Sequence, residues 1–394
     1  MNMVDFVSIS KNILCSVQQE RFAGYDPFDF LNSSIFNRTG LAGSERARLV
    51  WLQFGKRSPV NFRPLVGVPK KRNPKGIGLF ILGMLEDFKR THDEQFLHTA
   101  IDLADWLLTH VSEQNTWQFP CWGYHFDWQA RAFFVPKGKP NIITTCYIAR
   151  ALFDLGKLIE REDYVKASLD AALFIHKYLL TRADGRTFFA YIPGETAFVH
   201  NASLWGAAWV ARAGVEMGNT ELQDSALTIV RQSVNEQCEN GAWVYGARRH
   251  HQFIDGFHTG YNLEAIDMVR KTMGTTEFDH AIASGMDYYR SKFFLEDGTA
   301  KYYHNKIYPL DVHSFSQGVL TLLKVGGEAA DIELSRKIML RAVETMYLFA
   351  EHRFIYQHHR WFTNSIDYIR WTQAWAYYGL AFFNRYMAEN NNEN

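Results

Sequence analysis

Apolar runs recur along the chain, and each run follows a short cluster of polar and aromatic residues. Six such runs begin at a spacing of roughly 50–60 residues, a period typical of repeated helical hairpins. The runs are apolar on nearly every face, which indicates buried helices. Their first residues lie near Asn73, Asn141, His200, His258, Asp311 and Tyr368.

More polar stretches alternate with these runs, and each carries a single apolar stripe. Apolar residues at helical spacing predict amphipathic helices over residues 94–111, 162–180, 220–237, 277–294 and 330–350. A shorter stretch, residues 44–54, is expected to supply the outer helix of the first hairpin. Buried helices alternating with amphipathic ones predict an all-α (α/α)6 toroid, with an inner ring of helices inside an outer ring.

The connections between the predicted helices differ in length. Long aromatic segments lead into the buried helices, such as residues 117–141 and 241–258, whereas short ones lead out of them, such as residues 273–276. The long segments would therefore emerge on one rim, beside the N-termini of the inner helices. Loops of this length usually carry function, and helix N-termini attract anions. A uronate or another anionic sugar would suit such a rim.

The domain organisation follows from the same pattern. We expect residues 1–394 to form one toroid domain, with residues 1–40 as an N-terminal extension packed on it. Residues 388–394 are polar and are expected to form a disordered tail.

Composition excludes several classes of function. Lys+Arg and Asp+Glu number 42 each, so no basic surplus indicates nucleic acid or an anionic membrane. No CxxC pair occurs among the four cysteines, so we expect no metal, and we expect no other cofactor because nucleotide-binding glycine motifs are missing. We find no signal peptide and no apolar run long enough to span a membrane, which predicts a cytoplasmic protein. Aromatic residues make up 15% of the chain, and such rings also serve as stacking platforms for sugars.

Two helix entries contain the candidate catalytic residues. Asp255 and Asp311 each lie at the start of an inner helix, followed closely by His258 and His313. Glycosidases use a pair of carboxyl groups, about 5–5.5 Å apart for retention or about 6.5–9.5 Å apart for inversion. We therefore assign acid, base or nucleophile roles to the two aspartates and tuning roles to the two histidines. The alternative is that each aspartate only caps its helix, and Glu264, deeper in its helix, is open to a buried, paired role.

Further polar and aromatic residues near the predicted rim are candidates for substrate binding. Aromatic rings would stack on sugars, and arginines would hold hydroxyl or carboxylate groups. Arg370 is costly to bury unpaired, so it either pairs with an acid, such as Asp367, or binds an anionic substrate. The complete set is Trp122, Tyr124, Asp127, Arg131, His200, Asn201, Tyr261, Arg370 and Trp371.

Several of these segments together resemble VpsJ-type polysaccharide-biosynthesis proteins, which belong to bacterial exopolysaccharide clusters. The resemblance lies in residues 24–29, 122–131, 255–264, 308–313 and 370–375. It implies an (α/α)6 toroid, similar to N-acylglucosamine 2-epimerases and unsaturated glucuronyl hydrolases. It carries no settled reaction, so it assigns no catalytic residue.

Three functions follow as hypotheses. The first is an enzyme that acts on an exopolysaccharide or its repeat unit, by glycoside hydrolysis at Asp255 and Asp311. The second is a uronate or sugar epimerase or a polysaccharide lyase, in which His or Tyr removes a proton and Arg neutralises a carboxylate. The third is a non-catalytic glycan-binding assembly protein. All three predict an oligo- or polysaccharide partner and leave contact with the polysaccharide assembly machinery open.

Overall fold

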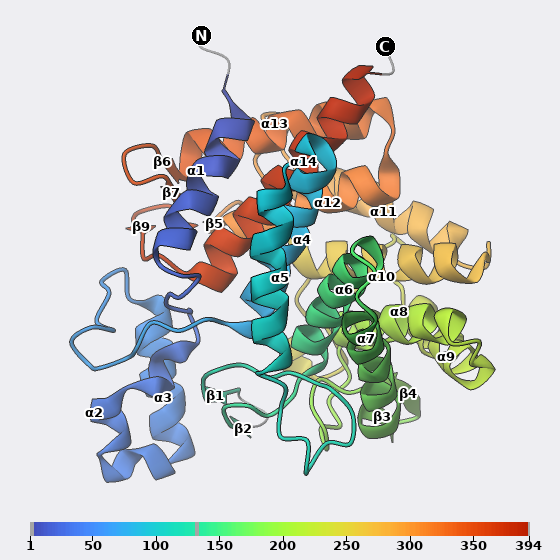
Figure 1. The fold of residues 1–394 in the computed structure, drawn as a ribbon, viewed down its shortest axis with the longest axis horizontal. Helices are drawn as coiled ribbons and strands as arrows, with labels where there is room; N and C mark the ends of the chain where they lie inside the picture. Colours follow the sequence, from blue (N-terminus) through green and yellow to red (C-terminus); the bar gives the residue numbers. More distant parts are fainter. Residues whose placement is uncertain (1–3, 131–133, 393–394) are drawn as a thin grey trace.

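The computed structural model describes residues 4–130 and 134–392, and inner and outer helices form a closed ring (Figure 1). Each inner helix contacts the next along the chain, and the last returns to contact the first. The predicted (α/α)6 toroid is thus confirmed. The inner helices are α4 (Pro74–Thr91), α6 (Ile142–Leu158), α8 (His200–Glu216), α10 (Gly256–Met273), α12 (Val312–Thr321) and α14 (Trp375–Asn392).

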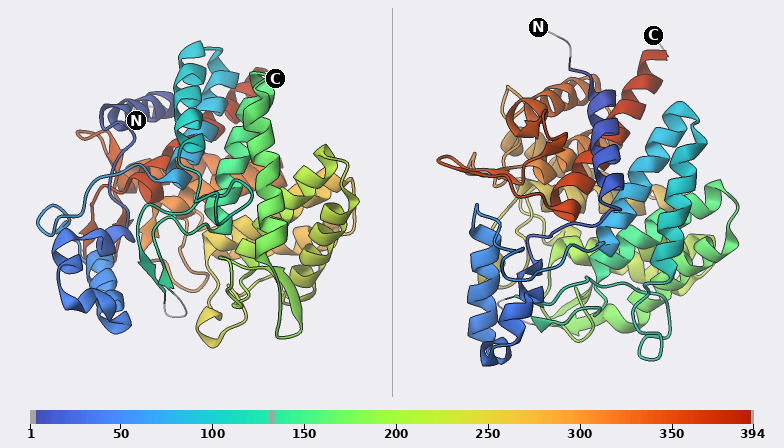
Figure 2. Two further views of the ribbon diagram at one scale, coloured as in Figure 1. Left: turned by 60° about the horizontal axis from the view of Figure 1, so that its bottom comes forward. Right: turned by 60° about the vertical axis from the view of Figure 1, so that its left-hand side comes forward.

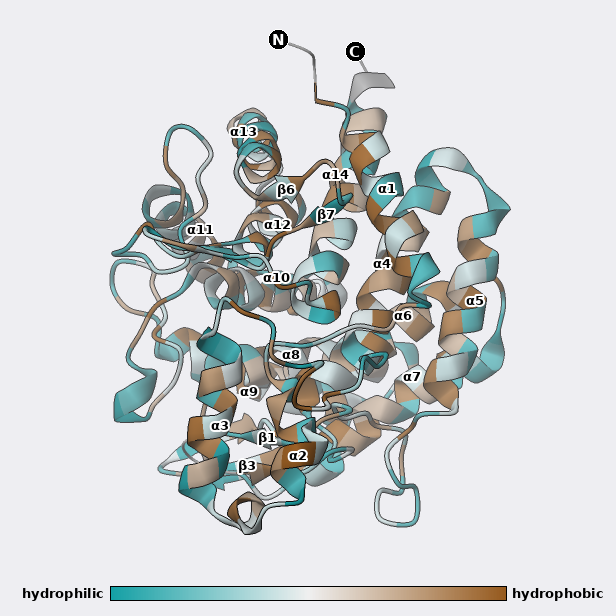
Figure 3. Ribbon diagram, turned by 90° about the vertical axis from the view of Figure 1, so that its left-hand side faces the viewer, coloured by the Kyte–Doolittle hydropathy of each residue, from teal (hydrophilic) through white to brown (hydrophobic). Residues whose placement is uncertain are grey.

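Five outer helices each pack on the inner helix that precedes them in the chain. In Figure 3, hydrophobic residues gather on the inner helices α4 and α6, whereas the outer helix α5 carries hydrophilic residues on its outward side. These outer helices are α5 (Glu94–Leu108), α7 (Glu162–Phe174), α9 (Thr220–Asn235), α11 (Asp279–Phe293) and α13 (Ala329–Met346).

The sixth outer position is filled by the N-terminal helix α1 (Phe6–Gln19), which contacts α14. The expectation that residues 44–54 take an outer position is wrong. They belong to α3 (Glu45–Arg57), which packs on neighbouring N-terminal segments and on β1. The physical reason is the apolar stripe: α1 buries four large aliphatic residues, whereas α3 buries only Leu52 and Gly55.

A small N-terminal cluster lies beside the ring, at the lower left of Figure 1. It contains η1 (Asp29–Asn32), α2 (Ser34–Asn37) and η2 (Gly40–Gly43), and it has its own apolar core around Phe30 and Leu52. An ion pair between fully buried groups, Arg63 Nε to Asp29 Oδ1 at 2.6 Å, ties this cluster together.

Short antiparallel strands lie in the long connections between outer and inner helices. Figure 2 shows the β3–β4 hairpin and the connection before α10 projecting from the same side of the ring. One three-stranded sheet has the order β5–β8–β9, and the others are two-stranded: β1–β2, β3–β4 and β6–β7. The strands are β1 (Trp128–Gln129), β2 (Phe134–Val135), β3 (Leu180–Ala183), β4 (Arg186–Phe189), β5 (Leu310–Asp311), β6 (Tyr347–Leu348), β7 (Arg353–Phe354), β8 (Gln357–His358) and β9 (Thr363–Asn364).

Short non-α turns complete the element order. They are η3 (Ile175–Leu179), η4 (Arg249–His251), η5 (Leu322–Gly326) and η6 (Ile369–Ala374). The last of these leads directly into α14, so the sixth inner helix effectively begins after Tyr368, as the sequence predicts.

Side-chain caps fix the start of four inner helices. The side chains of Asn73, Asn141, Asp255 and Asp311 each accept a hydrogen bond from a backbone N–H in the following turn. Such caps satisfy amide donors that have no partner within the helix. The capping alternative for both aspartates therefore holds.

The C-terminal end differs from the sequence expectation. Helix α14 continues to Asn392, so residues 388–392 extend the helix and do not form an irregular tail. None of the helices in the described part of the chain combines the length and apolar character needed to cross a membrane.

Candidate functional site

Five inner helices and η6, the segment that leads into the sixth, direct residues into one central cavity of about 150 Å³. The described residues that line it include no aspartate and no glutamate, but several groups able to move protons. Its wall consists of Phe28, Lys75, Tyr124, Phe126, Trp128, Ile143, Tyr191, Asn201, Tyr245, Phe257, His258, Tyr261, His313, Arg370 and Trp371.

His258 is held at the cavity wall by Asp255. Its Nδ1 lies 2.7 Å from Asp255 Oδ2, and the other carboxylate oxygen accepts the backbone N–H of His258 at 2.9 Å. Because the carboxylate accepts, the hydrogen of the neutral ring sits on Nδ1 and leaves Nε2 as the basic nitrogen. The His258 side chain is 22% exposed and the Asp255 side chain 1%. Asp255 therefore orients the imidazole and does not itself face the cavity.

His313 lines the same cavity and contacts Tyr261. Its Nε2 is 2.7 Å from the Tyr261 hydroxyl, and its buried Nδ1 has no hydrogen-bond partner among the described residues. The ring stacks on Trp375 at 4.3 Å and on Phe257 at 4.5 Å. Burial, aided by the charge of Lys75, holds the pKa of His313 well below its usual value, so the imidazole is neutral at neutral pH.

Lys75, in the first turn of α4, is a buried amine without a carboxylate partner. Its Nζ lies over the rings of Tyr147 at 4.5 Å, Trp375 at 5.3 Å and Tyr261 at 5.6 Å. No ion pair or side-chain hydrogen bond joins this amine to any other described residue. Burial, and then the nearby charge of Arg370, holds its pKa well below the usual value. An amine in this setting exchanges protons readily.

Arg370 meets the cavity from η6 with most of its charge already paired. Its Nε and Nη2 donate to the two oxygens of Asp26, at 2.6 and 2.8 Å, and both side chains are nearly fully buried. This two-point pair leaves Nη1 outside the bond to Asp26. Of the two roles predicted for Arg370, pairing with an acid is therefore present, although the acid is Asp26 and not Asp367.

Asp311 is fully buried and does not line the cavity. Its carboxylate accepts from Gln357 Nε2 at 2.7 Å, from Trp371 Nε1 at 3.1 Å and from the backbone N–H of His313 at 3.0 Å. Burial raises its pKa to about 6, against the opposing effect of these hydrogen bonds. It holds Trp371 in the wall, as Asp255 holds His258. The structure thus places the two predicted catalytic carboxylates behind the wall.

Three of the predicted binding residues besides Arg370 and Trp371 also line the cavity: Tyr124, Asn201 and Tyr261. The Tyr124 hydroxyl lies 3.1 Å from that of Tyr191, and Asn201 presents an amide oxygen without a partner among the described residues. An amide oxygen of this kind is available to accept from a sugar hydroxyl.

Three of the remaining predicted binding residues lie outside the cavity wall. Trp122 is fully buried in the core and donates its indole N–H to the Leu107 carbonyl at 2.9 Å. His200 packs against Phe198, and burial lowers its pKa to about 3. Asp127 accepts the backbone N–H of Lys137 at 2.6 Å, and Arg131 lies outside the described residues. Trp122, His200 and Asp127 lie near helix starts or in a rim loop, but none of these three side chains lines the cavity.

Sequence reasoning missed Lys75 and Asp26. Lys75 follows Pro74 at an inner helix start, which is the signal that would have identified it. Asp26 belongs to a segment that reads as a turn, and nothing in its local sequence indicates a partner 344 positions away. The aromatic wall residues Phe28, Tyr191 and Tyr245 were also missed, because they come from connecting segments and not from helix starts.

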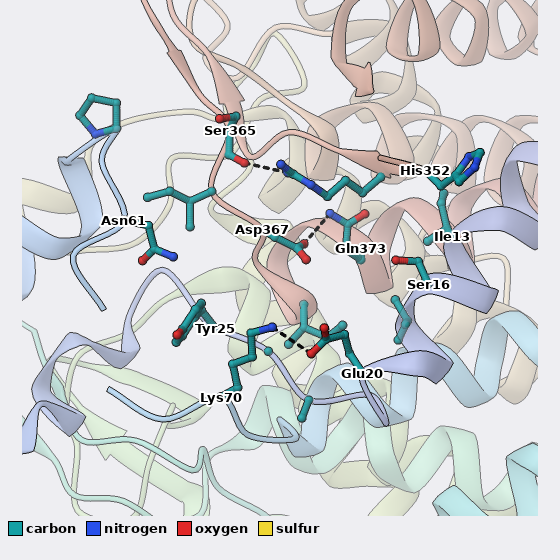
Figure 4. A pocket seen from close by; sticks show the side chains of 17 residues that line it. Ile13, Ser16, Glu20, Tyr25, Asn61, Lys70, His352, Ser365, Asp367 and Gln373 are labelled. Carbon is teal, nitrogen blue, oxygen red and sulfur yellow. Dashed lines mark hydrogen bonds and ion pairs between the residues drawn. The ribbon is translucent and has the colours of Figure 1, made fainter. Parts of the chain in front are cut away.

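A second hollow, of about 390 Å³, lies between α1 and the segment before η6 (Figure 4). Its polar groups are largely bonded to each other. Lys70 pairs with Glu20 at 2.8 Å, and Gln373 donates to Asp367 at 2.8 Å. The central cavity, with its unpartnered groups, is therefore the better candidate site. No cluster of potential metal ligands occurs within the described ranges 4–130 and 134–392.

The chain is similar in structure to sugar-processing enzymes. Cellobiose 2-epimerase from Bacillus thermoamylovorans matches with a TM-score of 0.62 and 10% identity, over 80% of this chain and 88% of that one. Unsaturated glucuronyl hydrolase from Bacillus sp. GL1 matches at 0.63 and 12%, over 96% and 95%. An unsaturated glucuronyl hydrolase specific for heparin matches at 0.64 and 13%, over 97% and 98%.

No family model and no curated protein matches the sequence. At the identities of these structural matches, the likeness establishes the fold and leaves the reaction to the site itself. The neighbours share the (α/α)6 toroid, which agrees with the ring described above.

Proposed function

We propose that this protein is a carbohydrate-active enzyme that transfers a proton at a carbon atom of a sugar, as an epimerase does. The observation that carries the proposal is the cavity wall, where two imidazoles and an unpaired amine take the place of carboxylates. The structural likeness to a cellobiose epimerase and to glucuronyl hydrolases supports a sugar as the substrate. The volume, well below the roughly 300–1,000 Å³ of pockets for drug-sized ligands, suits a single sugar unit.

The proposed reaction gives each group a role. His258 Nε2 removes the proton from the carbon next to the sugar carbonyl, and the electron pair moves onto the carbonyl oxygen. The amine of Lys75 and Nη1 of Arg370 stabilise the oxyanion that forms. The His258 imidazolium then returns the proton to the other face of the same carbon after the intermediate turns in the cavity, while the neutral His313, bonded to Tyr261, hydrogen-bonds the sugar. Asp255 and Asp311 act as positioning residues for His258 and Trp371.

Glycoside hydrolysis is the second candidate, and the raised pKa of Asp311 is the observation that favours it. A carboxyl group that stays protonated near pH 6 suits a general acid. Its oxygens are occupied by Gln357, Trp371 and a backbone amide, so hydrolysis requires that substrate displace them. The resemblance to VpsJ-type proteins supports an exopolysaccharide, or its repeat unit, as the source of the sugar.

The test is product analysis in deuterium oxide. The protein is incubated with reducing sugars, among them cellobiose, N-acetylglucosamine and galacturonate, and the products are followed by NMR. We expect deuterium at the carbon next to the carbonyl, an epimeric product and no cleavage. Release of new reducing ends from oligosaccharides without deuterium at carbon would contradict the proposal and establish hydrolysis.

The variant His258→Asn sharpens this test. Asparagine can still donate to Asp255 from a position close to that of Nδ1, so the helix entry keeps its hydrogen bond. The matched control is His250→Asn, an exposed histidine in η4. Deuterium incorporation must disappear in the first variant and persist in the second.

A further inference from the structure

A large groove of about 910 Å³ lies next to the central cavity and shares Tyr124 as a common wall. Two segments form most of its basic lining: residues 70–72, which lead into α4, and residues 136–139, which follow β2. The first segment is fixed by mutual backbone hydrogen bonds between Gly24 and Lys71. These hydrogen bonds hold one wall of the groove in a fixed position.

The groove is basic although the chain as a whole is neutral. Its lining contains one carboxylate, Glu113, against five cationic side chains: Lys70, Lys71, Arg72, Lys137 and Lys139. Two more carboxylates lie at its edge, where Glu20 pairs with Lys70 and Asp127 accepts a backbone N–H. No described carboxylate lies within ion-pair distance of Lys71, Lys137 or Lys139. Three cations therefore remain available to an anionic ligand.

Aromatic rings and an unpartnered histidine accompany these charges. Arg72 lies 5.5 Å from the ring centroid of Trp106, which in turn stacks on His110 at 3.9 Å. Both ring nitrogens of His125 are buried and have no hydrogen-bond partner in the described part of the chain. Burial lowers the pKa of His125 to about 4, so this imidazole is neutral and can both donate and accept. Planar rings beside hydroxyl-binding groups suit a sugar better than a bare phosphate.

We propose that this groove binds the acidic units of an oligosaccharide whose terminal sugar occupies the central cavity. The inference rests on the proposed function for the sugar in the cavity, and it specifies the substrate class as a glycan that carries carboxylates. Lys71, Lys137 and Lys139 would pair with these carboxylates, while Trp106 and Trp117 offer ring surfaces. Tyr124, present in both walls, would separate the terminal sugar from the next unit.

The test compares two glycans of equal length that differ in charge. Binding of oligogalacturonates and of cello-oligosaccharides is measured by calorimetry at low and at physiological salt. We expect the acidic series to bind more tightly, with an advantage that shrinks as salt rises because the exposed charges are screened. Equal affinity for the two series overturns the inference, and so does tighter binding of a single-stranded oligonucleotide, which would indicate a general polyanion surface.

A pair of double variants localises the effect. Lys71→Glu with Lys137→Glu reverses two exposed groove charges, and Lys11→Glu with Lys292→Glu reverses two exposed charges elsewhere. The groove variant is expected to lose about tenfold in affinity for oligogalacturonate, because each substitution removes an attraction to a carboxylate and adds a repulsion. The control variant is expected to lose little. Equal losses in both variants would contradict a local site.

The two proposals fail separately. The groove variant is expected to keep deuterium exchange on single sugars, because none of its changes touches the cavity. Absence of exchange in the unmodified protein, together with selective binding of the acidic series, refutes the proposed reaction and leaves the groove. Deuterium exchange on single sugars, together with equal binding of acidic and neutral oligosaccharides, refutes the proposed groove site and leaves the proposed reaction standing.

Discussion

Two regions of the inner ring differ in how their buried polar groups are bonded. In the middle of α10 a buried carboxylate has several partners, whereas at the N-terminal end of α4 a buried amine has no carboxylate partner among the described residues. Deep in α10, the buried Glu264 is bonded to Gln317, Thr321 and Lys324, with Lys324 Nζ at 3.0 Å. At the N-terminal end of the inner helix α4, Lys75 is buried among aromatic rings and has no carboxylate partner among the described residues.

The difference separates structure from function. A buried charge with a complete set of partners holds helices in register at little net cost, whereas a buried polar group without a partner lowers stability. Lys75, His313 Nδ1 and the Asn201 oxygen are all of the second kind, and all three residues line one cavity. Groups of this kind are retained where a ligand completes their bonding. The paired alternative for Glu264 is thereby confirmed.

Substitution of His258 is expected to have the largest effect. His258→Asn should lower turnover about 10³-fold, since a positioned general base contributes roughly 10²–10⁴-fold. Unfolding by urea should change little, because the bond to Asp255 can be kept. Steady-state kinetics on the sugar that takes up deuterium measures the loss. Turnover within a few-fold of the unmodified protein would remove His258 from the reaction.

Substitution of Lys324, which pairs with the buried Glu264, should lower the stability of the protein and leave its turnover unchanged. Lys324→Met leaves the buried Glu264 without its cation, which is expected to lower the free energy of unfolding by about 2–3 kcal/mol. The control Lys166→Met breaks an exposed pair with Asp170 and should cost about 0.5 kcal/mol. Urea denaturation of both variants measures the contrast, and equal small losses would contradict it.

Asp311 predicts a pH dependence of stability. Burial raises its pKa from 3.8 to about 6, so the folded state binds this proton more tightly than the unfolded state does. The free energy of unfolding should therefore fall as pH rises through this window, by up to about 3 kcal/mol from this group. Asp311→Asn cannot titrate, and its profile from pH 4 to 7 should be flatter. Parallel profiles would show that the proton is not held.

Local signals made most of the ring predictable. Asn73, Asn141, Asp255 and Asp311 stand where a cap is needed, and each precedes a run that is apolar on all sides. The prediction for residues 44–54 was wrong because these residues do form a helix, but their apolar stripe is too narrow to cover an inner helix.

The site was predictable only in part, because its partners come from distant segments. His258, His313, Tyr261 and Trp371 lie at helix starts and were found there. The pair of Arg370 with Asp26 joins opposite ends of the chain, and sequence spacing carries no sign of it. Other predictions failed because the sequence does not give the direction of a side chain: Trp122 and His200 lie near the rim, but their side chains are buried in the core.

One measurement tests the central claim most directly: the free energy of unfolding of Lys75→Met, determined together with its turnover. If Lys75 is retained for a ligand, methionine of similar length should raise the free energy of unfolding by about 1–2 kcal/mol, because an unpaired buried amine is removed. Turnover should fall about 100-fold at the same time, as when a group that stabilises an oxyanion is lost. A variant that is less stable and equally active would show that Lys75 is structural, and would contradict the account.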